Sequence, residues 1–430
     1  MTQAFPIQYC KDILQSDNFL RNFNIQILHE GHPPLYFILL KVWALCFGYS
    51  ELALRSFSLL CGLLSIIMLY ALVKDNYKGK YLAWAILLLV IFNPFLFYYF
   101  TEARMYAFAF LLATISYKYW IKYMKHKRIK SFDLLWFIVF SSALLYTHYY
   151  GLFFFLVLAF WDTLKNGFTI KLIYYAIPIL IFSPWTLVIK IQTELHHIHW
   201  TDGSYSLYNS IIGFGNGLIS LFFSPMSNAK KYEVIFSIAI SILLFYFLGN
   251  SWKKRFLFLC IIILYFLQIF LFDKILNHHT IVVPRYYIFI LILFYWSLAK
   301  AIQTCPKLIG MIIVSSYCLI GGFAIYQINS FTLAPKQMYK QLAGYIDTKH
   351  DAKNTVIVVE PGGPVIWGLS YYLKNNFRII SAQYSQSIDP SKKIIYVDEV
   401  LGDKYSEGHL NNVEQAKLKL VPFVGVFLYE

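Results

Sequence analysis

The chain has 430 residues, of which 59% are hydrophobic, 20% are aromatic and only 14% are charged. A soluble domain carries about 25% charged residues, so this composition excludes a water-soluble globular protein and predicts a membrane protein. The formal net charge of +15 does not indicate a nucleic-acid partner. The basic residues stand in small clusters between apolar runs, as in the cytoplasmic loops of membrane proteins.

Residues 1–50 precede the first apolar run of full length. Within them, Pro33 to Gly48 is apolar but short and is interrupted by Lys41, which predicts a juxtamembrane helix along the outer surface. No signal peptide or earlier span is apparent in these residues. We therefore expect either a truncated amino terminus, which we favour, or a first span that inserts with its amino end outward.

Residues 51–326 are predicted to form a multi-span transmembrane domain. A spanning helix needs roughly 20 mostly apolar residues, and about ten runs reach or approach that length. They are 52–73, 81–99, 105–123, 133–148, 150–164, 172–190, 233–249, 256–272, 286–302 and 308–326. The half-hydrophobic run 207–225 is interpreted as an interfacial or re-entrant helix, because a further span there would place a basic loop on the wrong face.

The loops between these runs are of two kinds. Basic loops lie at 74–80, 125–130, 165–171, 253–255 and 300–307. Counted span by span, they all fall on one face, which the positive-inside rule assigns to the cytoplasm. The intervening loops, near 101–104, 148–150, 191–209 and 274–285, then face outward.

After residue 327 the composition changes. The pattern predicts an amphipathic helix at 335–349, a helix near 364–374 and strands at 354–360, 377–381, 392–398 and 420–429. The count of spans places residues 327–430 outside. The predicted fold is thus a polytopic α-helical protein of the cell membrane with a small extracytoplasmic α/β domain at its carboxy terminus.

Two outward segments combine acidic and basic side chains. In the first, His29, Glu30 and His32 stand before two prolines that set a turn and suit a helix start. Its spacing lacks the HExxH pattern of zinc peptidases. The second holds Glu102 and Arg104 in a tight turn, where charges near the bilayer are costly unless they pair or have a task. An arginine fork suits phosphate, and a Glu–Arg pair that caps the turn is the alternative.

Other outward loops carry His148 in YTHYYG and Arg285 in PRYY. The alternatives are a structural hydrogen bonder for His148 and snorkelling to lipid headgroups for Arg285. A further group, interpreted as interfacial with metal binding as the lesser alternative, consists of His196, His197 and His199. The polar groups all gather on the outer face, whereas the inner loops hold little besides Lys and Arg. This convergence predicts chemistry on a lipid-linked substrate.

The stretches that carry these residues resemble one known class of protein. They are GHPPLYF (31–37), YSELALRSFSLL (49–60), NPFLFYYFTEARMYAF (93–108), YTHYYGLF (146–153) and PRYY (284–287). Together they resemble the PMT-like membrane glycosyltransferases with the GT-C fold, a class that includes protein O-mannosyltransferases and the aminoarabinose transferase of lipid A. The resemblance implies an inverting enzyme that moves a sugar from a polyprenyl-phosphate donor to a lipid, glycan or protein acceptor on the outer face.

The resemblance also implies roles for single residues. Transfer needs a carboxylate base for the acceptor hydroxyl and cationic groups or a divalent metal ion for the departing phosphate. The family carries an Asp-Glu pair after its first span, whereas this chain has Thr2-Gln3 near that place. We therefore predict Glu102 and Glu30 as the catalytic carboxylates and assign no metal ligands. The predicted substrate-binding residues are His32, Arg104, Tyr106, His148, Arg285 and Tyr286.

Two other functions stay open. The missing acidic pair would fit a truncated or non-catalytic relative that serves as a membrane scaffold. A lipid or sugar transporter is disfavoured, because transporters place ionisable groups near the bilayer midplane, and here those groups gather at one face.

Overall fold

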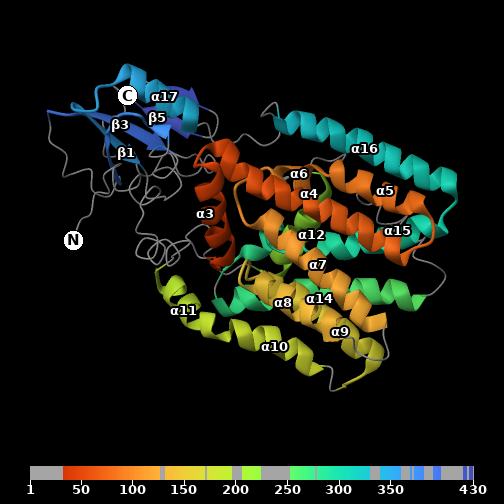
Figure 1. Cartoon of the computed structure of the whole chain (residues 1–430). Helices are drawn as coiled ribbons and strands as arrows, with labels where there is room; N and C mark the ends of the chain where they lie inside the picture. Colours follow the sequence, from red (N-terminus) through yellow and green to blue (C-terminus); the bar gives the residue numbers. More distant parts are fainter. Residues whose placement is uncertain are drawn as a thin grey trace. The chain divides into compact units, whose positions relative to one another are not determined.

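The computed structural model describes residues 32–125, 131–169, 172–195, 206–223, 252–276, 278–329, 339–359, 369, 372–381, 391–398, 420–423 and 426–429. The chain divides into two compact units: Gln26–Leu333, and Ala334–Glu430 together with Met1–Ile25. Each unit is described by itself below. Helices dominate the described part of the larger unit (Figure 1).

The helices of the larger unit follow the predicted apolar runs. They are α3 (Leu35–Phe47), α4 (Glu51–Asn76), α5 (Lys80–Ile91), α6 (Pro94–Phe100), α7 (Tyr106–Lys125), α8 (Ser131–Leu145), α9 (Gly151–Asn166), α10 (Ile173–Phe182), α11 (Thr186–Leu195), α12 (Leu207–Phe223), α14 (Trp252–Leu276), α15 (Ile290–Thr304) and α16 (Lys307–Asn329). Short 3₁₀ turns are η2 (Ser183–Trp185), η4 (Thr280–Val282) and η5 (Pro284–Tyr287). The predicted span 233–249 lies outside the described residues.

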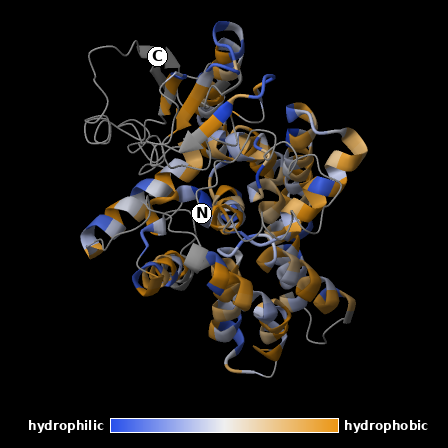
Figure 2. Ribbon diagram, turned by 90° about the vertical axis from the view of Figure 1, so that its left-hand side faces the viewer, coloured by the Kyte–Doolittle hydropathy of each residue, from blue (hydrophilic) through white to orange (hydrophobic). Residues whose placement is uncertain are grey.

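The interior of this unit is aromatic. Helix α7 packs against both α4 and α8, and the fully buried side chains include Tyr106, Phe110 and Phe154. The outer surfaces of the helices are apolar as well (Figure 2), and Leu180 and Leu319 are 66% and 76% exposed. Large apolar side chains exposed in such numbers mark a surface that faces lipid rather than water.

Three described helices are long and apolar enough to cross a membrane: Glu51–Asn76, Ile173–Gln192 and Lys307–Ile328. Helices α5 and α6 add a fourth if they count as one span, although they are bent by 66°. The run 81–99 is therefore not one continuous helix, although the bent pair can still count as one span, and fewer helices of the described part pass this test than the sequence predicts. Other apolar helices of the described part, α3, α8, α12 and α15, have only 10–17 residues in their apolar segments.

The break between α5 and α6 is built by Asn93 and Pro94. Asn93 caps α6, since its Oδ1 accepts a hydrogen bond from the Leu96 backbone N–H at 2.8 Å, and Pro94 begins the helix without needing a backbone donor. The buried Asn93 amide also donates to the Leu221 carbonyl (3.0 Å) and the Tyr295 hydroxyl (2.9 Å). One side chain thus shapes the break and holds it to α12 and α15.

Replacing Asn93 by aspartate separates these two tasks. Aspartate keeps the cap but cannot donate, so the Leu221 carbonyl loses its donor and a carboxylate is buried in place of the amide. We expect Asn93→Asp to lower the free energy of unfolding in detergent by about 2–3 kcal/mol, at least as much as Asn93→Ala. Asn76→Asp is the matched control, because the Asn76 amide donates to Leu72 O in its own helix. A stable Asn93→Asp variant would show that capping alone matters.

The smaller unit contains α17 (Tyr339–Lys349) and one sheet. The strands are β1 (Thr355–Val359), β2 (Arg378–Ser381), β3 (Lys393–Asp398), β4 (Leu420–Phe423) and β5 (Val426–Tyr429), in the order β2-β1-β3-β5-β4. β1 runs parallel to β2 and β3, while β5 is antiparallel to β3 and β4. All residues of β1 are buried, as expected of a parallel strand covered on both faces. Leu342 and Ile346 of α17 belong to the same apolar core.

One strand prediction in this unit is wrong. The sequence predicts a single strand over 420–429, but the structure has two antiparallel strands there, with Phe423 opposite Val426. Only Val424 and Gly425 separate them, and a two-residue connection with glycine is typical of a β-hairpin. The helix predicted near 364–374 lies mostly outside the described residues.

Candidate functional site

Helix α6 leads into the turn that carries Glu102 and Arg104. The backbone N–H of Thr101 donates to Phe97 O and Tyr98 O as α6 ends, and Arg104 N donates to Glu102 O at 2.8 Å. The Ser58 hydroxyl donates to Arg104 O at 3.2 Å and bonds the Tyr36 hydroxyl at 2.9 Å. The turn is thus tied to α4 and α3. It leaves Glu102 half-buried and Arg104 exposed.

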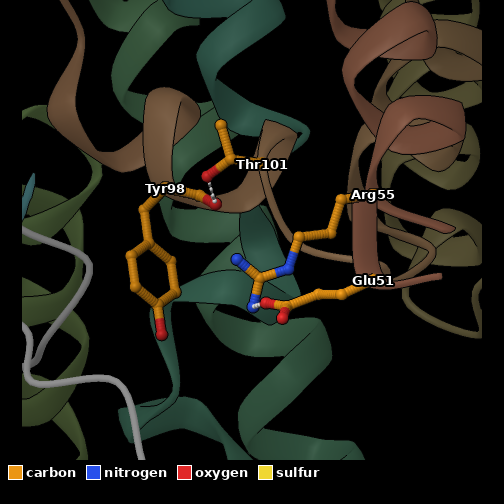
Figure 3. A network of polar contacts seen from close by, with 4 residues as sticks. All are labelled: Glu51, Arg55, Tyr98 and Thr101. Atoms are coloured by element: carbon orange, nitrogen blue, oxygen red, sulfur yellow. Dashed lines mark hydrogen bonds and ion pairs between the residues drawn. The ribbon is translucent and has the colours of Figure 1, made fainter. Parts of the chain in front are cut away.

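Figure 3 shows an ion pair near this turn. Arg55 and Glu51, on the first turns of α4, form a salt bridge of 2.7 Å with both side chains partly exposed. Helices α4 and α6 are in contact, and the pair lies beside the segment from Tyr98 to Thr101 (Figure 3). An exposed i,i+4 pair of this kind contributes little to stability.

His148 lies in the turn between α8 and α9. Its backbone N–H donates to Leu144 O, and its carbonyl accepts from Gly151 N, both at 2.9 Å. The side chain is 1% exposed. Five aromatic rings surround it with centroids 5.6–6.0 Å away, those of His32, Tyr106, Tyr150, Tyr286 and Phe289. A histidine predicted from a loop motif is therefore a fully enclosed side chain.

The hydrogen bonds of His148 determine where its proton sits. Nδ1 accepts a hydrogen bond from the backbone N–H of Tyr150 at 3.2 Å. Burial, with smaller effects of His32 and Arg285, holds the pKa of His148 well below its usual range. The neutral ring therefore carries its hydrogen on Nε2. That buried nitrogen has no hydrogen-bond partner within the described residues, so it is a donor available to a ligand.

The lowered pKa of His148 predicts a pH-dependent stability. The unfolded chain binds a proton near pH 6.5 while the folded protein does not, so stability is complete above that pH and falls as the pH decreases below it. The loss amounts to at most about 1.4 kcal/mol per pH unit. We expect the melting temperature in detergent to fall less between pH 7.5 and 5.5 in His148→Asn than in the wild type. Equal slopes would show that His148 is accessible to protons in the folded state.

The short helix η5 presents Arg285 and Tyr286. The guanidinium of Arg285 lies over the Tyr286 ring, 5.5 Å from its centroid, and the Tyr286 ring stacks on Tyr150 at 4.6 Å and 17°. Arg285 also interacts electrostatically with the phenols of Tyr99 and Tyr106. Arg285 therefore lies near phenols from α6, α7 and its own short helix.

The structure brings most of the predicted site residues together. Tyr106 is their common neighbour: Arg285, Tyr286, Arg104 and Glu102 all act electrostatically on its phenol. The phenol of Tyr98 interacts electrostatically with Glu102. His32 and His148 join the same cluster through their rings. Two other predictions lie outside the described residues: the catalytic residue Glu30, and the histidine group formed by His196, His197 and His199.

Residue-by-residue interpretation missed a second polar group beside this cluster. Asp273, Thr280 and the hydroxyl of Tyr150 are buried and in contact with one another. A carboxylate at the end of an apolar run, shortly before PRYY, was the signal in the sequence, since charges at membrane depth are costly and usually have a task. Within the described ranges, no three His, Cys, Asp or Glu side chains come close enough to hold a metal ion.

The chain is similar to known proteins in part of its sequence and in its fold. Residues 31–187 match the family model described as dolichyl-phosphate-mannose-protein mannosyltransferase. No curated protein matches the chain. The crystal structure of apo ArnT from Cupriavidus metallidurans matches with a TM-score of 0.56 and 12% identity, over 98% of this chain and 92% of that chain. ArnT from the same organism bound to undecaprenyl phosphate matches with a TM-score of 0.59 and 12% identity, over 92% and 87%.

The matched region runs from the turn before α3 to the start of α11, and it includes His32, Glu102, Arg104, Tyr106 and His148. The segment with Arg285 and Tyr286 lies beyond that match. The resemblance to PMT-like membrane glycosyltransferases is confirmed: the chain has the fold of ArnT and carries the sequence pattern of the mannosyltransferase family over residues 31–187.

Proposed function

We propose that the protein is a membrane glycosyltransferase that transfers a sugar from a polyprenyl-phosphate donor to a lipid, glycan or protein acceptor on the outer face. One observation carries the proposal. The carboxylate of Glu102 and the guanidinium groups of Arg104 and Arg285 lie near enough to the buried Tyr106 phenol to act on it electrostatically, in a chain with the fold of ArnT. These are the groups that the reaction requires, a base and a receptor for phosphate charge.

Arg104 and Arg285 would bind the donor phosphate. A guanidinium donates two parallel hydrogen bonds to phosphate oxygens, and it stays charged when buried. Arg104 is exposed on its turn, whereas Arg285 is partly buried against the Tyr286 ring. Arg104 can contact an incoming phosphate headgroup, and Arg285 can then bind it. ArnT bound to undecaprenyl phosphate supports a lipid phosphate as the ligand of this fold.

Glu102 would serve as the base. Its carboxylate takes the proton of the acceptor hydroxyl while the acceptor oxygen forms a bond to the anomeric carbon of the sugar. The bond from that carbon to the phosphate oxygen breaks, and the electron pair leaves with the polyprenyl phosphate, whose charge the arginines receive. A single displacement of this kind inverts the anomeric configuration. Glu102 is half-buried and stands two residues before Arg104 in the same turn, so the base lies next to a predicted phosphate-binding residue.

The outer face is supported by the distribution of charge. The site residues belong to loops that alternate along the chain with the basic loops near 74–80, 165–171 and 300–307. Because basic loops usually stay in the cytoplasm, this alternation supports an outward position for the site and for residues 327–430. Donors linked to a lipid rather than to a soluble nucleotide fit a site on that face.

The experiment is transfer of radiolabelled sugar from polyprenyl-phosphate donors to membrane lipids and proteins by the purified chain in detergent. We expect label in one acceptor class, and we expect Arg104→Ala to raise the KM for the donor. Arg55→Ala is the matched control, because it removes an arginine from the neighbouring ion pair and should leave transfer unchanged. Absence of transfer from every donor by a folded protein would overturn the proposal in favour of a non-catalytic relative.

A further inference from the structure

Asp273 is a buried carboxylate that the proposed reaction does not use. It lies near the end of α14 and is 4% exposed. Its Oδ1 accepts a hydrogen bond from the Thr280 hydroxyl at 2.5 Å, and its Oδ2 accepts one from the Ile281 backbone N–H at 2.8 Å. Both donors belong to η4, two residues before η5 begins. The carboxylate thus fastens the segment that leads directly to Arg285.

The hydrogen bonds continue from Thr280 to the site. The Thr280 hydroxyl also contacts the hydroxyl of Tyr150. A threonine has only one hydroxyl hydrogen, and Asp273 accepts it, so the Tyr150 hydroxyl must be the donor to Thr280. This series of hydrogen bonds therefore has one direction, from the Tyr150 hydroxyl through the Thr280 hydroxyl to the Asp273 carboxylate. It connects the start of α9 to the segment between α14 and α15.

Tyr150, held by its hydrogen bond to Thr280, in turn contacts the predicted binding residues Tyr286 and His148. Its ring stacks on Tyr286, which carries the guanidinium of Arg285 on its face. Its backbone N–H donates to Nδ1 of His148 and thereby leaves the hydrogen of that ring on Nε2. The orientation of Arg285 and the donor of His148 both depend on where Tyr150 is held.

We propose that Asp273 is a positioning residue which, through Thr280 and Tyr150, holds Arg285 and His148 in the geometry that binds the donor phosphate and its sugar. The proposal rests on the proposed function, because it assigns a ligand to that same site. Breaking this series of hydrogen bonds should weaken binding of the lipid phosphate without removing any group that touches the phosphate.

The test measures binding of undecaprenyl phosphate to the purified full chain, together with its melting temperature. Thr280→Val and Tyr150→Phe each remove one hydroxyl and keep the shape of the side chain. We expect each to raise the Kd roughly tenfold, in the range found for residues in one hydrogen-bonded network. Thr280→Ser keeps the hydroxyl and should restore wild-type binding. The variant with both Thr280→Val and Tyr150→Phe should bind undecaprenyl phosphate no more weakly than either single variant, because both substitutions break the same series of hydrogen bonds.

Asp162→Asn is the control that distinguishes a positioning role of Asp273 from a general loss of stability. Asp162 is another buried aspartate of the same unit, and it accepts hydrogen bonds from Tyr175 and Asn166 away from the cluster around Tyr106. We expect it and Asp273→Asn to lower the melting temperature to a similar degree, with only Asp273→Asn raising the Kd. Equal Kd values in both would reduce Asp273 to a structural role.

Two further outcomes distinguish failure of the positioning role from failure of the proposed glycosyltransferase function. If Arg285→Ala abolishes binding while the Thr280 and Tyr150 variants bind like the wild type, the positioning role is overturned and the glycosyltransferase proposal stands. If the wild type binds no undecaprenyl phosphate, the donor assignment fails and the positioning role falls with it.

Discussion

Glu102→Gln is expected to abolish sugar transfer while leaving donor binding intact. Glutamine has nearly the same shape as glutamate but cannot take a proton from the acceptor hydroxyl. Loss of a general base lowers the rate by about 10²–10⁴-fold. The KM for the polyprenyl-phosphate donor should change little, because the arginines that bind the phosphate stay in place. The measurement is the initial rate of label transfer at saturating donor, with donor binding determined separately.

Glu51→Gln is the matched control for this variant. Glu51 is a second glutamate near the same turn, but it pairs with Arg55 on the surface of α4 (Figure 3). Its replacement should cost little stability and leave the rate unchanged. If Glu102→Gln kept the wild-type rate, the base would have to be another carboxylate, and Glu30 would be the next to replace.

Gly321→Ala is expected to destabilise the fold although it improves helix propensity. A Cβ at Gly321 of α16 would lie 2.0 Å from the backbone carbonyl oxygen of Phe92, at the end of α5. Backbone at a helix break cannot move aside as a flexible side chain can, so α16 must shift. Such overpacking costs about 1–3 kcal/mol, more than the roughly 1 kcal/mol that alanine gains over glycine in a helix. Thermal unfolding in detergent measures the net effect.

The adjacent glycine provides the control. A Cβ at Gly322 would meet only the ring atoms of Phe92 at 3.5 Å, which is an ordinary contact. Gly322→Ala should therefore be neutral or slightly stabilising. If the two variants unfolded at the same temperature, the close approach of α16 to the break would be wrong.

The positions of the helices could be read from the sequence, because long apolar runs have few alternatives in a membrane protein. The break at Asn93 was missed, although an Asn-Pro pair is a recognisable helix start. The apolar residues continue without interruption on both sides of it, and that run outweighed the local signal. The hairpin at 420–429 was missed for the same reason, since a single glycine stands inside a β-rich run.

The candidate site was predictable as a list but not as an arrangement. Counting the spans assigned the loops with Glu102, His148 and Arg285 to one face of the membrane. In the structure all three residues lie near Tyr106. Asp273 and Tyr150 could not be paired in this way. The hydroxyl of Tyr150 meets Thr280, which is 130 residues away, and such a contact depends on how α9 and α14 pack rather than on any local pattern.

The bend between α5 and α6 bears on how far a lipid headgroup must travel. A helix rises about 1.5 Å per residue, so the 12 residues of α5 extend about 18 Å. The 7 residues of α6, tilted by 66°, and the short connection add only about 7 Å in the same direction. That falls short of a hydrocarbon layer about 30 Å thick, and any tilt of α5 shortens it further. If α5 begins at the inner edge of that layer, Glu102 and Arg104 lie below the level of the surrounding headgroups, and a polyprenyl phosphate can deliver its sugar while its tail stays in the bilayer.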